Sequence, residues 1–293
     1  MWPSWGHWNC KEGLFVGKSV RYLLIFNGDC AWECWKRNTP FHESIPTLVW
    51  RENFLEGPLP SGVSTEEFEL IRADFLHRCV PEYSAEGIYR FLMQLHTTLE
   101  EFDSPECEII LYFDCCMYDM ILLARILFLL KDSSARIRLF CEDVIPGNAP
   151  QVFAVPYTSL RLLSPETVSL YAHAWECVLQ GASAVAQFNK EDLAADERFL
   201  KLAMIRYGED HPVEGGLGRT QKQLLEIVRS GVSAFPEIFR AFDRYELYMF
   251  MGDTHCYRLL RSLTEEGFLR MEKSSSSDPY GSFYPGEKKV ESL

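Results

Sequence analysis

Four short apolar runs in the first half of the chain alternate with stretches in which hydrophobic residues recur at helical spacing. The runs are VRYLLIF at 20–26, TLVW at 47–50, CEIILYF at 107–113 and RIRLFC at 136–141. Near-continuous apolar runs are typical of strands covered on both faces, as in a parallel sheet. The intervening patterns predict helices at about 30–37, 65–78, 85–102 and 117–131. This alternation predicts an α/β, Rossmann-like domain with a mostly parallel sheet over residues 17–150.

The second half of the chain changes to helical patterns with short breaks. Ser164 followed by Pro165 predicts the start of one helix, because serine caps a first turn and proline suits its first position. Thr220 and Asp253 are predicted as N-caps of two later helices. Three helices and a short strand then predict a mainly α-helical, winged-helix-like domain, which completes a helical region over 151–273. The Ser, Gly and Pro content of 274–293 predicts a flexible tail.

Length and composition favour a globular protein with no membrane span. The chain has 293 residues, 47% of them hydrophobic, which is enough for two domains. Its longest apolar run, 109–130, is interrupted by Asp114, Asp119 and Arg125, so we expect a buried strand followed by a buried helix. The first residues hold three tryptophans but no cationic region before an apolar stretch, so no secretory signal is predicted. The predicted location is cytoplasmic.

The ten cysteines are predicted to be reduced thiols. Most of them lie within strand or helix patterns, where cysteine behaves as a small apolar residue. Cys30 and Cys34 are four residues apart and Cys115 and Cys116 are adjacent, but the chain contains no C-x-x-C pair. A zinc site of the usual cysteine spacing is therefore not predicted.

The charge of the chain makes nucleic acid an unlikely partner. The formal net charge is −13, and residues 17–150 hold 12 basic and 21 acidic side chains, which repel phosphate backbones and anionic lipid. Residues 217–273 hold nine basic and eight acidic side chains, whereas a helix that reads a DNA groove normally lies in a clearly basic patch. A protein partner is the favoured interpretation for 217–273, and a protein-interaction or transcription-related adaptor is a further alternative for the function.

Polar residues follow the predicted strands and mark the candidate ligand site. They are Asn27, Gly28 and Asp29 after the first strand, Arg51 and Glu52 after the second, Asp114 after the third with Asp119 nearby, and Glu142 and Asp143 after the fourth. In open parallel sheets, ligands bind outside the carboxyl ends of the strands. Gly28 allows a turn with positive φ, and the helix N-terminus beyond it can face an anion. We expect a small polar or phosphorylated ligand here, with Arg51 as an anion clamp; the alternative for Asp29 is a helix N-cap.

The same acids also suggest a cofactor. Asp29, Glu52 and Asp114 would suit Mg²⁺, which is usually held by one or two carboxylates and substrate oxygens. The corresponding function is a magnesium-dependent enzyme of nucleotide or phosphoester metabolism, and the alternative is that these acids only face solvent. No G-x-S-x-G motif or H-x-x-x-H pair occurs, so no catalytic residue is predicted.

Five segments resemble the bacterial family known as domain of unknown function 1835 (DUF1835), with the helical domain that usually follows it. They are FNGDCAWE at 26–33, LVWRENFLEGPLP at 48–60, LYFDCCMYDMILLARIL at 111–127, GLGRTQKQLLE at 216–226 and FMGDTHCYRLLRSL at 250–263. The most specific piece is W-x-x-x-x-x-E-G-P at 50–58. The resemblance implies the fold and the position of the site, but no reaction. This chain departs from the family pattern at Glu52, where Asp is usual, and at Cys116 and Met120, where acidic and Gln residues are common.

Overall fold

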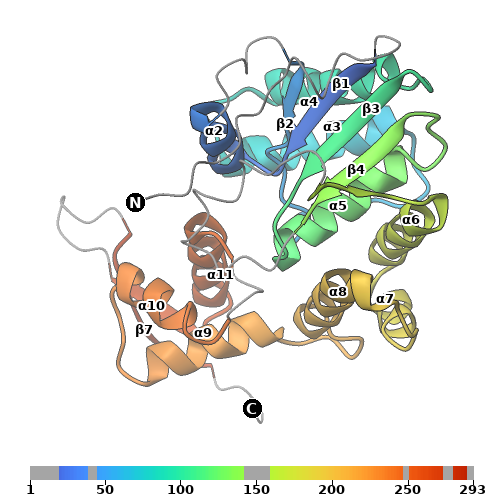
Figure 1. The fold of residues 1–293 in the computed structure, drawn as a ribbon. Helices are drawn as coiled ribbons and strands as arrows, with labels where there is room; N and C mark the ends of the chain where they lie inside the picture. The colour runs from blue at the N-terminus through green and yellow to red at the C-terminus, as the bar shows by residue number, and fades with distance from the viewer. Residues whose placement is uncertain (1–19, 39–44, 142–158, 247–250, 273–279, 289–293) are drawn as a thin grey trace, which may run out of the picture. The chain divides into compact units, whose positions relative to one another are not determined.

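A computed structural model describes residues 20–38, 45–141, 159–246, 251–272 and 280–288 (Figure 1). Glu142, Asp143 and the predicted interdomain loop at 144–150 lie outside these ranges. The chain divides into two compact units, Met1–Cys115 with Asp119–Gln180, and Cys116–Tyr118 with Gly181–Leu293.

The first unit is built on a five-stranded sheet of order β2-β1-β3-β4-β5. Its strands are β1 (Arg21–Phe26), β2 (Thr47–Val49), β3 (Cys107–Tyr112), β4 (Arg136–Phe140) and β5 (Arg161–Leu162). All neighbours pair in parallel except β4 and β5, which are antiparallel. The predicted α/β fold with a mostly parallel sheet is therefore confirmed. Strand β5 was not predicted, because two residues are too few to show a period.

In the described part of the chain, five helices belong to the sheet unit. They are α2 (Asp29–Asn38), α3 (Thr65–Cys79), α4 (Ala85–Glu101), α5 (Met117–Leu129) and α6 (Pro165–Gln180). Ser64 caps the start of α3, because its hydroxyl accepts the Glu67 backbone N–H at 3.2 Å. Ser164 accepts the Thr167 N–H at 3.2 Å in the same way at the start of α6.

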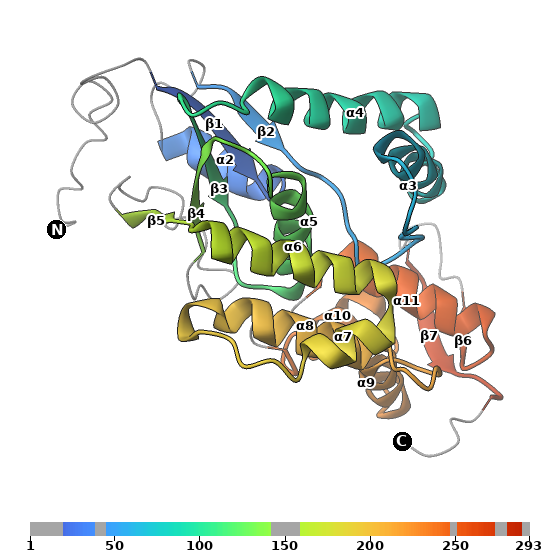
Figure 2. The same ribbon diagram turned by 90° about the vertical axis from the view of Figure 1, so that its right-hand side faces the viewer.

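The two faces of the sheet are covered by different helices. Leu24 and Phe26 of β1 and Tyr112 of β3 pack in one cluster with Ala31 and Trp35 of α2. The rings of Phe26 and Tyr112 stack with centroids 5.1 Å apart. Helices α4 and α5 lie on the other side of the sheet (Figures 1 and 2). Both faces are thus covered, which explains why β3 is buried along its whole length.

The first unit continues through α6 to Gln180, past the predicted domain boundary at residue 150. The reason is the fully buried indole of Trp175 in α6. It meets the rings of Phe54 and Phe68 edge-on, with centroids 4.9 and 6.2 Å apart. The Arg125 guanidinium lies 5.5 Å from the same indole. This aromatic contact attaches the helix to the sheet unit.

The second unit is mainly helical and ends in a two-stranded hairpin. Its elements are α7 (Ala182–Phe188), the 3-10 helix η4 (Ala195–Glu197), α8 (Arg198–Asp210), α9 (Arg219–Arg229), α10 (Phe235–Phe242), α11 (Asp253–Glu265), β6 (Leu269–Glu272) and β7 (Ser282–Pro285). Leu224 of α9, Ile238 of α10 and Leu260 of α11 share one buried core with Phe283 of β7. Strand β6 confirms the strand predicted after the last helix.

The N-caps predicted for α9 and α11 are wrong by one or two residues. Gly218 and Gly252 hold the cap positions, with extended backbone before each helix. The Gly218 N–H donates to the Gln221 side chain at 2.9 Å, which fixes the start of α9. Thr220 instead lies in the first turn, where its hydroxyl donates to Asp210 at 2.9 Å. Asp253 is the first residue of α11.

The flexible tail predicted for 274–293 is wrong for Ser282–Pro285, which form β7. This strand pairs antiparallel with β6. Phe283 is fully buried, and the Tyr280 ring packs against Phe235 with centroids 4.7 Å apart. The packing of these aromatic side chains stabilises the strand although the segment as a whole is polar. Composition alone does not show which side chains of a segment are packed in this way.

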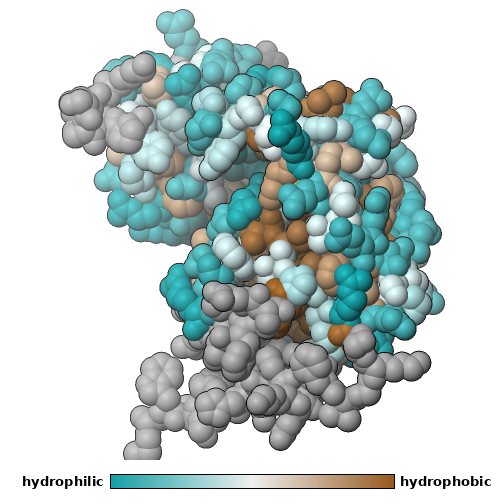
Figure 3. Space-filling view, turned by 90° about the horizontal axis from the view of Figure 1, so that it is seen from above, coloured by the Kyte–Doolittle hydropathy of each residue, from teal (hydrophilic) through white to brown (hydrophobic). Residues whose placement is uncertain are grey.

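In the described part of the chain, no helix is both long and apolar enough to cross a membrane. The apolar run at 109–130 divides into β3 and α5, as predicted. The nine cysteines within the described residues are all free thiols. On the face seen in Figure 3, hydrophilic side chains surround a smaller area of hydrophobic ones.

Candidate functional site

The centre of the sheet has the strand order at which open α/β sheets bind ligands. Strand β1 leads to β2 on one side of the β1–β3 pair, and β3 leads to β4 on the other side. Because such crossovers are right-handed in nearly all proteins, α2 and α5 lie on opposite faces, and the strand order reverses at the carboxyl ends of β1 and β3 (the crevice). The register pairs Phe26 with Tyr112, so both strands end at the same level. Residues that follow the two strands therefore meet at one edge.

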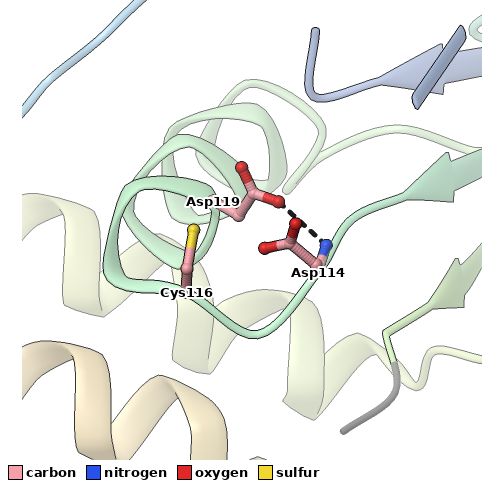
Figure 4. Close-up of side chains that lie close together, drawn as sticks. All are labelled: Asp114, Cys116 and Asp119. Atoms are coloured by element: carbon pink, nitrogen blue, oxygen red, sulfur yellow. Dashed lines mark hydrogen bonds between the residues drawn. The ribbon is translucent and has the colours of Figure 1, made fainter. Parts of the chain in front are cut away.

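Asn27, Asp114 and Asp119 meet at this edge. The Asn27 side-chain amide donates to Asp119 Oδ2, and the Asp114 backbone N–H donates to the same oxygen at 2.8 Å. Asp119 lies in the first turn of α5 and is 1% exposed. Figure 4 shows its carboxylate directed toward Asp114. The sequence predicted all three residues for the site, and the structure brings them together.

The Asp114–Asp119 pair favours a bound proton. Burial is the main cause that raises the pKa of Asp119 well above its usual value, and the charge of Asp114 and a side-chain hydrogen bond to it act in the same direction. Two carboxyl groups at hydrogen-bond distance cannot both ionise without a large repulsion. A protonated Asp119 can therefore donate a hydrogen bond to Asp114.

Within the described residues, one group of three side chains is arranged to hold a metal ion. Asp114, Cys116 and Asp119 each offer a ligand atom, and these atoms lie within 4.8 Å of one another (Figure 4). Carboxylates suit hard cations such as Mg²⁺, while a thiolate favours softer ions such as Zn²⁺. The set predicted from the sequence for Mg²⁺, Asp29, Glu52 and Asp114, is not formed.

Asp29 and Arg51 form a separate pair at the ends of β1 and β2. The Arg51 guanidinium donates from Nη2 and Nε to the two carboxylate oxygens at 2.8 and 2.9 Å. This hydrogen bonding lowers the pKa of Asp29. The side chains are 45% and 56% exposed for Arg51 and Asp29, so solvent screens the pair. An anionic ligand would share the Arg51 charge with Asp29.

Gly28 has the positive φ that the sequence predicted, with a value of 147°. Its carbonyl accepts the Trp32 N–H at 3.2 Å, which begins the hydrogen bonding of α2. No atom lies within 4 Å of the position a Cβ would take. The glycine is therefore required for the backbone conformation and leaves the helix N-terminus uncovered on that side.

Glu52 takes no part in the crevice, so its predicted role as a magnesium ligand is wrong. Its Oε1 accepts from Arg72 Nε at 2.7 Å, and the two side chains are 1% and 0% exposed. Burial is the main cause that raises the pKa of Glu52, against the lowering effect of Arg72. The Arg72 guanidinium neutralises the negative charge of the Glu52 carboxylate, which would otherwise attract a cation.

Arg72 is the residue that sequence reasoning missed. It lies four residues after Phe68 and three before Phe75, so it stands on an apolar stripe of α3. A charged residue at such a position normally has a buried partner. That interruption of the stripe is the signal that could have revealed the pair with Glu52.

The W-x-x-x-x-x-E-G-P segment at 50–58 has a structural role around the same arginine. Besides its bond to Glu52, Arg72 donates to the carbonyls of Asn53, Glu56 and Pro58 at 2.7, 2.8 and 3.2 Å. The loop after β2 is thus folded around one guanidinium. This segment is the most specific piece of the resemblance to DUF1835. It determines the geometry of the loop after β2 and supplies Arg51 near its start.

Comparison of the chain with protein-family models finds no match, and comparison with curated proteins finds none either. The resemblance to the DUF1835 family therefore rests on the five segments alone.

Replacing Asp119 by asparagine is expected to flatten the pH dependence of unfolding. Because the folded-state pKa of Asp119 is raised, the native state keeps a proton that the unfolded chain releases near about pH 4. The resulting stability is complete below about pH 4 and is lost as the pH rises through the folded-state pKa. Urea unfolding at a series of pH values from about 4 to 8 should show a steeper loss for the wild type than for Asp119→Asn. Parallel profiles would contradict the assignment.

Asp29→Asn is the matched control, with the opposite sign. Because the pKa of Asp29 is lowered, its contribution is present above about pH 4 and is lost as the pH falls through the folded-state pKa. Solvent screens this exposed pair, so the change should stay below about 1 kcal/mol.

Proposed function

We propose that the sheet unit binds a small polar ligand, with a phosphate as the preferred group, at the carboxyl ends of β1 and β3. The observation that carries the proposal is the meeting of Asn27, Asp114 and Asp119 at the point where the strand order reverses. Ligands of open α/β sheets bind at such points. Asn27 Oδ1 is buried and has no hydrogen-bond partner among the described residues, so the polar groups at this point are not fully satisfied by the protein.

Two features favour an anionic group on that ligand. Helix α2 begins directly after Gly28, and the free N–H groups of a helix N-terminus attract negative charge. Arg51 adds an exposed guanidinium at the neighbouring strand end. The acidic pair is compatible with an anion when Asp119 holds its proton. A phosphate ligand would then take hydrogen bonds from the amides and Arg51.

A thermal-shift screen of nucleotides, sugar phosphates and inorganic phosphate tests the proposal. A ligand at 100 times its Kd adds about 2.7 kcal/mol of stability, which is a measurable shift. Arg51→Met should remove most of the shift. Arg136→Met is the control, because Arg136 is similarly exposed but starts β4 at the amino end of the strand. No shift with any compound, or equal shifts in the two variants, would contradict the proposal.

A divalent cation is the second candidate for this crevice, and Asp114, Cys116 and Asp119 favour it. The screen is therefore repeated with Mg²⁺, Mn²⁺ and Zn²⁺, each alone and with phosphate compounds. A shift that needs the cation and disappears in Asp114→Asn supports the metal-dependent alternative. A phosphate shift that is independent of cations supports simple anion binding.

The helical unit suggests a separate function in protein contact. Helices α9, α10 and α11 are followed by the β6–β7 hairpin, and Ala234 before α10 bridges to Ser282 of β7. This is the order of elements in a winged-helix module, which we propose for residues 217–288. The near balance of charges in 217–273 favours a protein partner over DNA.

No sequence-specific DNA binding is expected from α11. Its Leu260 and Leu263 are fully buried, and Arg261 pairs with Glu265 at 3.7 Å. Groove recognition needs arginine, asparagine or glutamine side chains directed at the bases. Fluorescence anisotropy with duplex DNA at physiological salt should give no affinity tighter than about 1 μM, the limit of non-specific contacts. Tighter binding that is lost in Arg258→Ala/Arg261→Ala would contradict this prediction.

A further inference from the structure

A second polar cluster lies in the interior of the sheet unit, apart from the crevice. Its members are Trp50 and Glu52 after β2, Glu69 and Arg72 of α3, His96 of α4 and Arg125 of α5. Glu52 and Glu69 are each 1% exposed, and Arg125 is 4% exposed. Charged side chains are rarely buried to this extent unless every polar atom has a partner.

The cluster is continuous. Glu69 Oε1 accepts from Arg125 Nη2 at 3.0 Å and lies 2.8 Å from His96 Nε2. The charges of both Glu69 and Arg125 act on Glu52, so the two ion pairs are neighbours. The indole of Trp50 meets the His96 ring edge-on, with centroids 6.3 Å apart.

Four polar atoms of this cluster have no hydrogen-bond partner among the described residues. Two are acceptors, Oε2 of Glu52 and Oε2 of Glu69, and two are donors, Nε of Arg125 and Nε1 of Trp50. Each unpaired buried group costs about 1–3 kcal/mol, and charged groups cost more. Four of them would cost as much as the whole stability of a typical domain, about 5–15 kcal/mol.

We propose that ordered water molecules bind inside this cluster and join its two unpaired donors to its two unpaired acceptors. Water accepts from an N–H and donates to a carboxylate at the same time, and buried waters typically make about three hydrogen bonds. Charge argues against an ion. Two glutamates face two arginines, so a cation would be repelled by the guanidinium groups and an anion would be repelled by the carboxylates.

Oxygen-17 magnetic relaxation dispersion of water tests this on the full chain. Wild-type protein should show long-lived internal water, and Trp50→Phe, which removes one donor and keeps an aromatic ring, should lower the dispersion amplitude. Trp35→Phe is the control, because Trp35 is equally buried but packs on the opposite face of the sheet with α2. An amplitude that is absent in the wild type, or equal in the wild type and Trp50→Phe, would overturn the proposal.

A crystal structure of the wild type at a resolution that shows ordered solvent is the second measurement, and it does not depend on any variant. The expected result is solvent density within hydrogen-bond distance of Glu52 Oε2 and Glu69 Oε2. Direct contact between these two oxygens, which requires a shared proton, would overturn the proposal, as would a dry interior. Neither experiment involves the crevice, so a failure here leaves the proposed ligand site unaffected.

Discussion

Arg72→Met is expected to reduce the free energy of unfolding by about 3–5 kcal/mol, the usual cost of removing one partner from a buried ion pair. The substitution leaves the Glu52 carboxylate buried without its cation. It also removes the donors of three backbone carbonyls in the loop after β2. Urea denaturation followed by circular dichroism would measure the loss.

Two variants separate the parts of this effect. Arg78→Met changes the same residue type on the same helix, but Arg78 is 60% exposed, so a loss within about 0.5 kcal/mol is expected. The double variant Arg72→Met/Glu52→Met removes the unpaired charge and should recover part of the stability. The part of the stability that the double variant does not recover measures the contribution of the hydrogen bonds from Arg72 to the loop carbonyls. A loss in Arg72→Met no larger than in Arg78→Met would contradict the structural role assigned to Arg72.

Gly57→Ala is expected to cost about 2 kcal/mol or more, because left-handed backbone strain of about 1–3 kcal/mol is joined by a steric clash. Gly57 has φ of 78°, and an added Cβ would lie 2.6 Å from the Phe75 ring. That ring is 5.1 Å from the Arg72 guanidinium, so its displacement disturbs the support of the loop. Thermal or urea unfolding measures the loss.

Gly62→Ala is the matched control for that substitution. Gly62 has φ of 73°, but no atom lies within 4 Å of its added Cβ. Only the conformational strain remains, about 1 kcal/mol. Adding Phe75→Leu to Gly57→Ala should relieve the clash and bring the cost toward that of Gly62→Ala. Equal losses for the two single glycine variants would show that the contact with Phe75 carries no energy.

The sequence predicted the sheet because its strands are nearly continuous apolar runs covered on both faces. The same patterns predicted α3 and α5 closely, since capping residues and buried helical spacing are local signals. Strands β5 and β7 escaped prediction for a different reason. Their stability depends on partners distant in sequence, such as the Phe283 contacts with the core of the helical unit.

The candidate site was predicted in part. Strand-end reasoning found Asn27, Asp114 and Asp119, because parallel strands end at one edge and their loops converge there. It could not assign the role of Glu52. This residue follows β2 as the other acids follow their strands, but its side chain is buried and accepts a hydrogen bond from Arg72. Choosing between solvent, a metal and a buried partner requires the position of α3, and no local pattern of residues near Glu52 supplies it.

The pairing of β1 with β3 has a consequence for synthesis on the ribosome. β1 hydrogen-bonds to a short β2 on one edge and to β3 along its whole length on the other, and β3 follows only after α3 and α4. During translation the apolar strand at Arg21–Phe26 therefore emerges long before its main partner. Parallel pairing between such distant segments is slow and exposes strand edges to aggregation. The apolar strand β1 thus lacks its main pairing partner until residues 107–112 have left the exit tunnel.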